Sequence, residues 1–248
     1  ILNYHLIVIS GDHLNKIMKD VRKILHSFVA LEIIEEDDKK IVAKDFLNLR
    51  DVSVPENVRR MDIIIRGMFE DMIKSVYGEV DRTIYERDFD VNRFCFLILR
   101  AVHGAMENPS TARILNIQNK DLLAIWFLSI NLEDIGDEIK RISRFLGEHK
   151  LDEDMKKSIK SVFLEVHKSY LEVMKAYYTN DPERAIHVDL VKDGLIADCN
   201  KLFEKNPSIG IGRILERLKK LISGIGSIAW VVFGAKLTEK DNLISKPG

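Results

Sequence analysis

The stretch Leu128-Ser-Ile-Asn-Leu-Glu-Asp-Ile-Gly-Asp-Glu-Ile-Lys-Arg-Ile-Ser-Arg-Phe-Leu146 decides the fold of this chain. Its apolar residues recur every three or four positions, as residues on one face of an α-helix do. This stripe consists of Leu128, Leu132, Ile135, Ile139, Ile142 and Leu146. The pattern predicts a long amphipathic helix whose apolar face packs against other helices.

The chain downstream of Pro55 divides into six segments with the length of long helices. They are residues 55–77, 81–106, 119–147, 152–179, 182–204 and 208–234. Helix-breaking residues lie between them: Gly78, Asn108-Pro109-Ser110, Gly147, Asn180-Asp181-Pro182 and Asn206-Pro207-Ser208. The second segment also carries an apolar stripe, made of Ile84, Val91, Phe94, Cys95, Ile98 and Val102. Because the loops are short, we expect antiparallel helix bundles.

The triplet Asn-Pro-Ser follows the second helix of each set of three, at 108–110 and again at 206–208. A motif that returns at the same place in two sets of helices indicates a duplication. We therefore predict one three-helix repeat at 51–148 and another at 149–235, followed by a polar tail at 236–248.

Residues 1–50 form a different kind of segment, with strand-like and helix-like patterns in close succession. We expect a strand at 4–9 and a helix capped by Asp12 that runs to His26. Its apolar face would be Leu14, Ile17, Val21, Ile24 and Leu25. Two more strands are predicted at 28–35 and 40–46, joined by a turn at 36–39. A βαββ unit this small buries little surface by itself. We expect it to pack on the helices that follow or on a missing N-terminal piece, and its apolar character also suggests a homodimer. The predicted fold class is thus mainly α, behind a small α/β connector.

The composition argues against several classes of protein. The 248 residues include 38 basic and 39 acidic side chains, for a formal net charge of −1, without the basic balance of a dedicated nucleic-acid binder. Two cysteines, Cys95 and Cys199, do not make a disulfide framework and fit a reducing cytoplasm. The most apolar stretch, 221–235, is too short to cross a bilayer. No nucleotide-binding, nucleophile-elbow or zinc motif occurs, so we expect neither an enzyme nor an organic cofactor.

Three stretches of the helical part resemble the PhoU family. They are Arg59-Arg-Met-Asp-Ile-Ile-Ile-Arg-Gly-Met-Phe-Glu-Asp71, Glu86-Arg-Asp-Phe-Asp-Val-Asn-Arg-Phe-Cys-Phe-Leu-Ile-Leu-Arg100 and Asn131-Leu-Glu-Asp-Ile-Gly-Asp-Glu-Ile139. The resemblance covers residues 50–235 and is strongest in the first repeat. It implies a cytoplasmic protein of two three-helix bundles that restrains phosphate uptake by contacting a phosphate transporter or a sensor kinase.

The same resemblance extends to the connector, which is similar to that of archaeal members. There it follows an AbrB-type DNA-binding domain that this chain does not contain. An alternative function is therefore the sensor half of a phosphate-responsive transcription regulator, with nucleic acid bound only through a domain upstream. A third interpretation is a metal-storing or metal-dependent hydrolytic bundle.

Some PhoU members bind metal through carboxylate pairs four residues apart, and the resemblance places this site in the first repeat. The pairs map to Glu133 and Asp137, and to Asp88 and Asn92, where the amide lacks the charge. Such oxygens suit a divalent or iron-type ion, although a solvated charged helix face would give the same spacing. In the second repeat only Asp193 and Glu216 match, and Lys220 replaces the second acid. We predict at most one occupied site.

Overall fold

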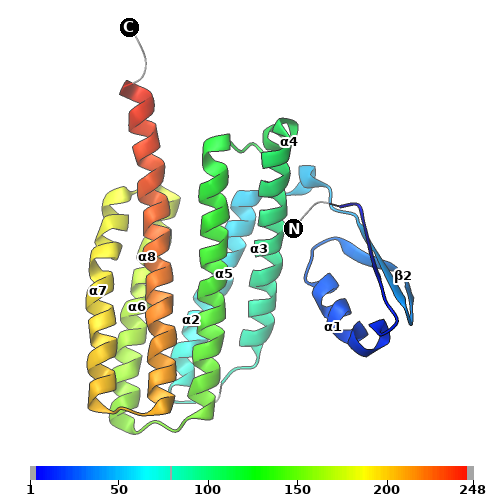
Figure 1. The fold of residues 1–248 in the computed structure, drawn as a ribbon. Coiled ribbons are helices and arrows are strands. Elements are labelled where there is room, and N and C mark those ends of the chain that lie inside the picture. Colours follow the sequence, from blue (N-terminus) through cyan, green and yellow to red (C-terminus); the bar gives the residue numbers. More distant parts are fainter. Residues whose placement is uncertain (1–3, 79, 245–248) are drawn as a thin grey trace. The chain divides into compact units, whose positions relative to one another are not determined.

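The computed structural model describes residues 4–78 and 80–244, with side chains described up to residue 234. Most of the chain is helical, and a small sheet precedes the long helices, which confirms the predicted fold class (Figure 1). The strands are β1 (Leu6–Ser10), β2 (Leu31–Asp37) and β3 (Lys40–Asp45), and a 3-10 turn η1 spans Leu49–Asp51. The helices are α1 (Leu14–His26), α2 (Val54–Ser75), α3 (Thr83–Glu107), α4 (Pro109–Ile114), α5 (Asn119–Glu148), α6 (Glu153–Thr179), α7 (Pro182–Lys205) and α8 (Ile209–Ile244).

The six predicted long helices correspond to α2, α3, α5, α6, α7 and α8, and most of their ends lie within two residues of the predicted ones. The short helix α4 was not predicted. Asn108 was read as a breaker, but its side chain accepts a hydrogen bond from the Ser110 amide and so caps a new helix that begins at Pro109. At the other end, α8 continues to Ile244, into the segment predicted as a polar tail, and residues 245–248 lie outside the described part.

The chain packs as two compact units. One consists of Ile1–Arg60 with Asn92–Ser129, and the other of Met61–Val91 with Ile130–Gly248. The boundaries fall inside α2, α3 and α5 instead of at the ends of the predicted repeats. A long helix can take part in more than one packed core, so a repeat in the sequence need not be a packing unit. The duplication at 51–148 and 149–235 stays a prediction about the sequence.

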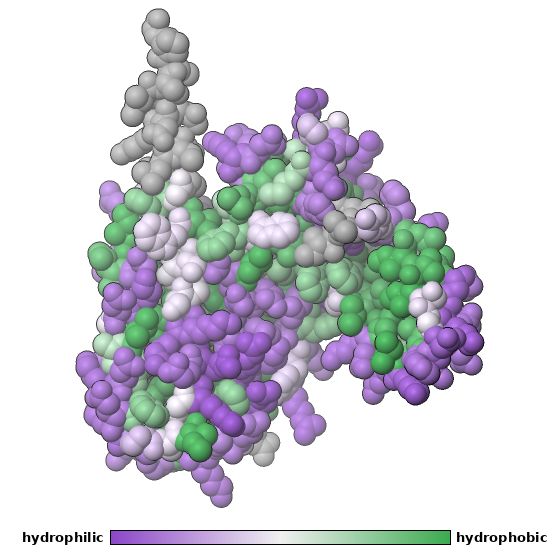
Figure 2. All heavy atoms as spheres, viewed as in Figure 1, coloured by the Kyte–Doolittle hydropathy of each residue, from purple (hydrophilic) through white to green (hydrophobic). Residues whose placement is uncertain are grey.

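In the first unit, β1, β3 and β2 form an antiparallel sheet in that order, and α1 covers one face. The core between them consists of Leu14, Leu25, Leu31, Ile41 and Ala43. The opposite face leaves Leu6 and Val8 about half exposed, and Figure 2 shows apolar side chains gathered on the surface of this segment.

Two details of the α/β segment differ from the prediction. The residue that precedes α1 is His13, and no side chain caps the helix, because Asp12 lies 3.2 Å from the Lys39 ammonium instead. Ile17 and Ile24 are also exposed, so only part of the predicted apolar stripe of α1 is core. The sheet has only three strands, so it covers only part of the apolar stripe of the thirteen-residue helix α1.

The start of β2 also differs, since the strand begins at Leu31 and not at residue 28. Ala30 has a φ of 61°, which turns the backbone out of the extended conformation just before the strand. The Phe28 ring instead stacks on Phe96 of α3, with ring centroids 5.1 Å apart. A buried ion pair from Arg100 of α3 to Asp45 at the end of β3 joins the same elements, and Arg100 also donates to the Val29 carbonyl at 3.0 Å.

In the second unit, α6, α7 and α8 pack side by side (Figure 1). One buried carboxylate, Asp62 of α2, organises the contact with α6. Arg66 donates two hydrogen bonds to it at 2.9 and 2.8 Å, and the hydroxyls of Tyr170 and Tyr178 donate at 2.9 and 3.0 Å. Tyr170 is fully buried, and burial followed by the Asp62 charge holds the pKa of its hydroxyl well above the ordinary value. The charge is therefore buried with all the donors that it requires.

Candidate functional site

The candidate site lies on α5, where four carboxylates follow one another over six positions. Glu133 and Asp137 are four residues apart, as are Asp134 and Glu138, so each pair shares one side of the helix. The six residues of the apolar stripe, from Leu128 to Leu146, are all buried. Gly136 faces the core, where a Cβ atom would lie 3.5 Å from Val91 of α3. The helix thus presents a continuous acidic edge beside its packed face.

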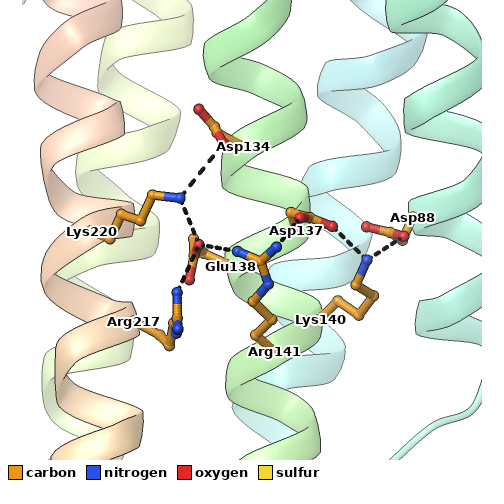
Figure 3. A network of polar contacts seen from close by, with 8 residues as sticks. All are labelled: Asp88, Asp134, Asp137, Glu138, Lys140, Arg141, Arg217 and Lys220. Carbon is orange, nitrogen blue, oxygen red and sulfur yellow. Dashed lines mark hydrogen bonds and ion pairs between the residues drawn. The ribbon is translucent and has the colours of Figure 1, made fainter.

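A lysine lies between the two aspartates that the sequence singled out. The ammonium of Lys140 donates to Asp88 of α3 at 2.7 Å and to Asp137 of α5 at 2.5 Å (Figure 3). Arg141 donates to the second oxygen of Asp137 at 2.6 Å. Asp88 and Asp137 therefore lie close together, with a cation of the chain itself between them.

Charge and burial act in opposite directions on these groups. Burial alone would lower the pKa of Lys140, but its hydrogen bonds to Asp137 and Asp88 outweigh burial and raise it, which keeps the ammonium charged. Burial likewise opposes ionisation of Asp137, yet Lys140 and Arg141 lower its pKa. For Asp88, burial outweighs the help of Lys140 and raises the pKa. Lys140 thus favours the ionised form of Asp137 more than that of Asp88.

Glu133 lies half-buried one turn before Asp137. Burial, followed by the charges of Asp137 and two further carboxylates, raises the pKa of Glu133 to about 7. Within the described part of the chain, no side-chain donor reaches this carboxylate. Glu133 is therefore the group of the cluster whose charge changes close to neutral pH.

Glu138 is the residue that sequence reasoning missed, and its side chain is completely buried. Its Oε1 accepts from Arg141 at 2.6 Å and from Lys220 of α8 at 2.9 Å, and Arg217 of α8 lies 3.6 Å away (Figure 3). Its Oε2 has no hydrogen-bond partner among the described residues. Lys220 also lies 3.7 Å from Asp134. Lys220, which stands in place of an acid in the predicted second repeat, thus pairs with acids of the predicted first repeat.

Among the remaining predicted residues, Asn92 lies one turn after Asp88 on α3. Asp193 is exposed on α7, and Glu216 is exposed on α8 and paired with Lys219. Lys192, the neighbour of Asp193 in the chain, lies beside Gly226 of α8. Gly226 is ten residues from Glu216, which corresponds to roughly 15 Å along a helix. The structure therefore does not bring Asp193 and Glu216 together.

As the structure places them, the residues do not fit a metal ion. Over the residues that the structure describes, no three His, Cys, Asp or Glu side chains are grouped so that they could hold one. The oxygens of Asp88 and Asp137 that face each other both contact Lys140. A divalent or iron-type ion at this cluster, which stays a prediction, would require Lys140 to leave.

Part of the chain matches the model of a known family. Residues 58–146 match the family model of the PhoU domain, a range that contains α3 and most of α2 and α5, with the whole acidic edge. No curated protein and no solved structure matches the chain. In the described part of the chain, none of the helices is both long and apolar enough to cross a membrane.

Lys220→Met tests the buried carboxylate. Glu138 is fully enclosed and would lose one of its close cations, so we expect the free energy of unfolding to fall by about 1–3 kcal/mol. The matched control is Lys219→Met, because Lys219 pairs with the exposed Glu216 and its loss should cost under about 0.5 kcal/mol. Urea denaturation of both variants gives the comparison. In a Glu138→Gln background, Lys220→Met should lower the free energy of unfolding only slightly. If Lys220→Met lowers it equally in both backgrounds, Lys220 does not stabilise the chain through Glu138.

Glu133→Gln tests the raised pKa. The folded chain keeps the Glu133 proton up to a pKa of about 7, whereas the unfolded chain releases it near the ordinary value of 4.5. Wild-type stability should therefore fall as the pH rises through this window, because the unfolded state then binds fewer protons. We expect the variant to be more stable by about 1–2 kcal/mol at pH 8, allowing for solvent screening, and no different at pH 4. Thermal denaturation across pH measures this.

A control for the pH series is Glu86→Gln, since Glu86 is an exposed glutamate on the neighbouring helix α3. It removes the same kind of side chain from a position outside the acidic edge of α5. A Glu133→Gln variant whose stability runs parallel to that of wild type from pH 4 to pH 8 would contradict the assignment.

Proposed function

Since the chain carries a PhoU domain at residues 58–146, we propose that it regulates phosphate uptake and phosphate homeostasis. It would act in the cytoplasm, by contact with a phosphate-transporter component or a sensor kinase and not by catalysis. The single observation that carries the proposal is the family match. It covers the acidic edge of α5 together with Asp88 of α3 and the cations Lys140 and Arg141, whereas Lys220 of α8 lies outside the matched range.

The structure supports a role in protein contact through its surface chemistry. Around the acidic edge, cations and carboxylates are interleaved and mostly paired. Figure 2 shows hydrophilic side chains over the part of the surface where α5 and α8 lie in Figure 1. A surface of alternating charge selects partners by electrostatic complementarity more than by buried apolar area.

Phosphate uptake by cells provides the test. In the native host, deletion of the gene should raise the initial rate of labelled phosphate uptake in phosphate-rich medium, because the restraint on the transporter is lost. Re-expression of the wild-type chain should restore the lower rate. An affinity pull-down with the chain as bait, from cells grown with and without phosphate, should capture a transporter component or a sensor kinase.

The outcomes separate the alternatives. Unchanged uptake in the deletion strain would contradict the proposed restraint. A deletion that leaves uptake unchanged but alters transcription of phosphate-responsive genes would favour the alternative function, a sensor half of a transcription regulator.

We further propose a homodimer that forms through the exposed apolar residues of the α/β segment. Leu6 and Val8 of β1 are about half exposed, and so is Phe46 just after β3. Large exposed apolar patches commonly mark interaction sites.

Light scattering on the purified chain tests the dimer. We expect a mass of two chains for wild type and a shift toward the single-chain mass for Val8→Lys. Ile63→Lys is the control, because Ile63 is similarly exposed but lies on α2. A wild-type mass of one chain at all concentrations would contradict the dimer.

A further inference from the structure

The contact between α3 and α5 is built around one cation. Asp88 and Asp137 come from different helices and would repel each other if nothing lay between them. The Lys140 ammonium lies within hydrogen-bonding distance of both, at 2.7 and 2.5 Å, and most of its side chain is covered. Both contacts join a charged donor to a charged acceptor, the strongest class of hydrogen bond in proteins. The place between the two carboxylates is therefore occupied by a well-held positive charge.

A divalent ion would need the same oxygens. Hard cations bind carboxylate oxygens at about 2.0 to 2.6 Å, so an ion shared by Asp88 and Asp137 would lie where the ammonium lies. Arg141 adds a second positive charge at the other oxygen of Asp137. A divalent ion that entered with both cations in place would meet strong repulsion from them.

We propose that Lys140 is the resident cation of this cluster, and that its ammonium takes the place between α3 and α5 that a divalent ion would require. The wild-type chain then binds such ions only weakly, and the link between the two helices does not depend on metal supply. Removal of the ammonium leaves Asp88 and Asp137 facing each other beside Glu133, with Arg141 still paired to Asp137. That arrangement is an oxygen-rich site for a hard cation. This proposal is independent of the regulatory function proposed above.

Binding of Mn²⁺ to the full chain tests the proposal, with the electron paramagnetic resonance signal of the free ion as the readout. We expect Lys140→Met and Lys140→Gln to bind one equivalent of Mn²⁺ at least tenfold more tightly than wild type. Lys140→Arg keeps the charge and should bind as weakly as wild type. Lys192→Met is the matched control, because Lys192 also pairs with an acid three residues earlier on its helix and is covered to a similar degree.

A second substitution locates the gained site. Adding Asp88→Asn to Lys140→Met should abolish the gained affinity, since one of the two oxygen donors is then neutral. Circular dichroism of each variant checks that the helices are intact. A folded Lys140→Met or Lys140→Gln variant with wild-type affinity would overturn the proposal.

Wild-type chain alone provides a further readout that needs no lysine variant. Ligands that bind the folded state raise the Tm by mass action, so we expect the Tm of wild type to be the same in Mn²⁺ and in a chelator. A Tm that rises in Mn²⁺, and no longer does so after Asp137→Asn, would show that a metal ion and not Lys140 is the resident cation, and would overturn the proposal.

Discussion

The arrangement of α5 and α8 depends on one buried charge. Glu138 is enclosed completely, and an ionised carboxylate in such a place is tolerated only with cations close to it. Arg141 comes from the same helix, but Lys220 and Arg217 must come from α8. These two residues are three apart and therefore face the same side of α8. The need to neutralise Glu138 thus fixes both the rotation of α8 and its position along α5.

Close packing reinforces this register. Gly224, four residues after Lys220, lies where a Cβ atom would come within 3.3 Å of Ile135. The absence of a side chain there allows the two helices to approach each other next to the ion pairs. Apolar contact alone would permit several similar offsets between two helices, whereas a buried charge with its partners permits few. Buried polar groups are known to specify register in this way in some helical assemblies.

The carboxylates along the acidic edge of α5 are neutralised in the same way, by cations of the chain. Each carboxylate pair is balanced by cations one turn away or on a neighbouring helix: Lys140 between Asp88 and Asp137, Arg141 between Asp137 and Glu138, and Lys220 between Asp134 and Glu138. Only Glu133 lacks such a partner in the described part of the chain, and its pKa is raised accordingly. Most of the acid charge on this edge is therefore balanced by cations of the chain itself.

The sequence by itself determined the long helices, their buried stripes and the presence of an α/β segment, because these depend on periodicity and on local breakers. It also indicated that Asp88 and Asp137 belong together, through the resemblance to a known family. Only the tertiary structure decided which charges meet. Lys140 follows Asp137 by three residues, but nothing local says that it also reaches Asp88 on another helix. Lys220 looked like the loss of an acidic ligand until folding placed it against Glu138, 82 residues away. Helix periodicity is a property of neighbouring residues, whereas the partner of a buried charge is set by long-range packing, which a single sequence does not display.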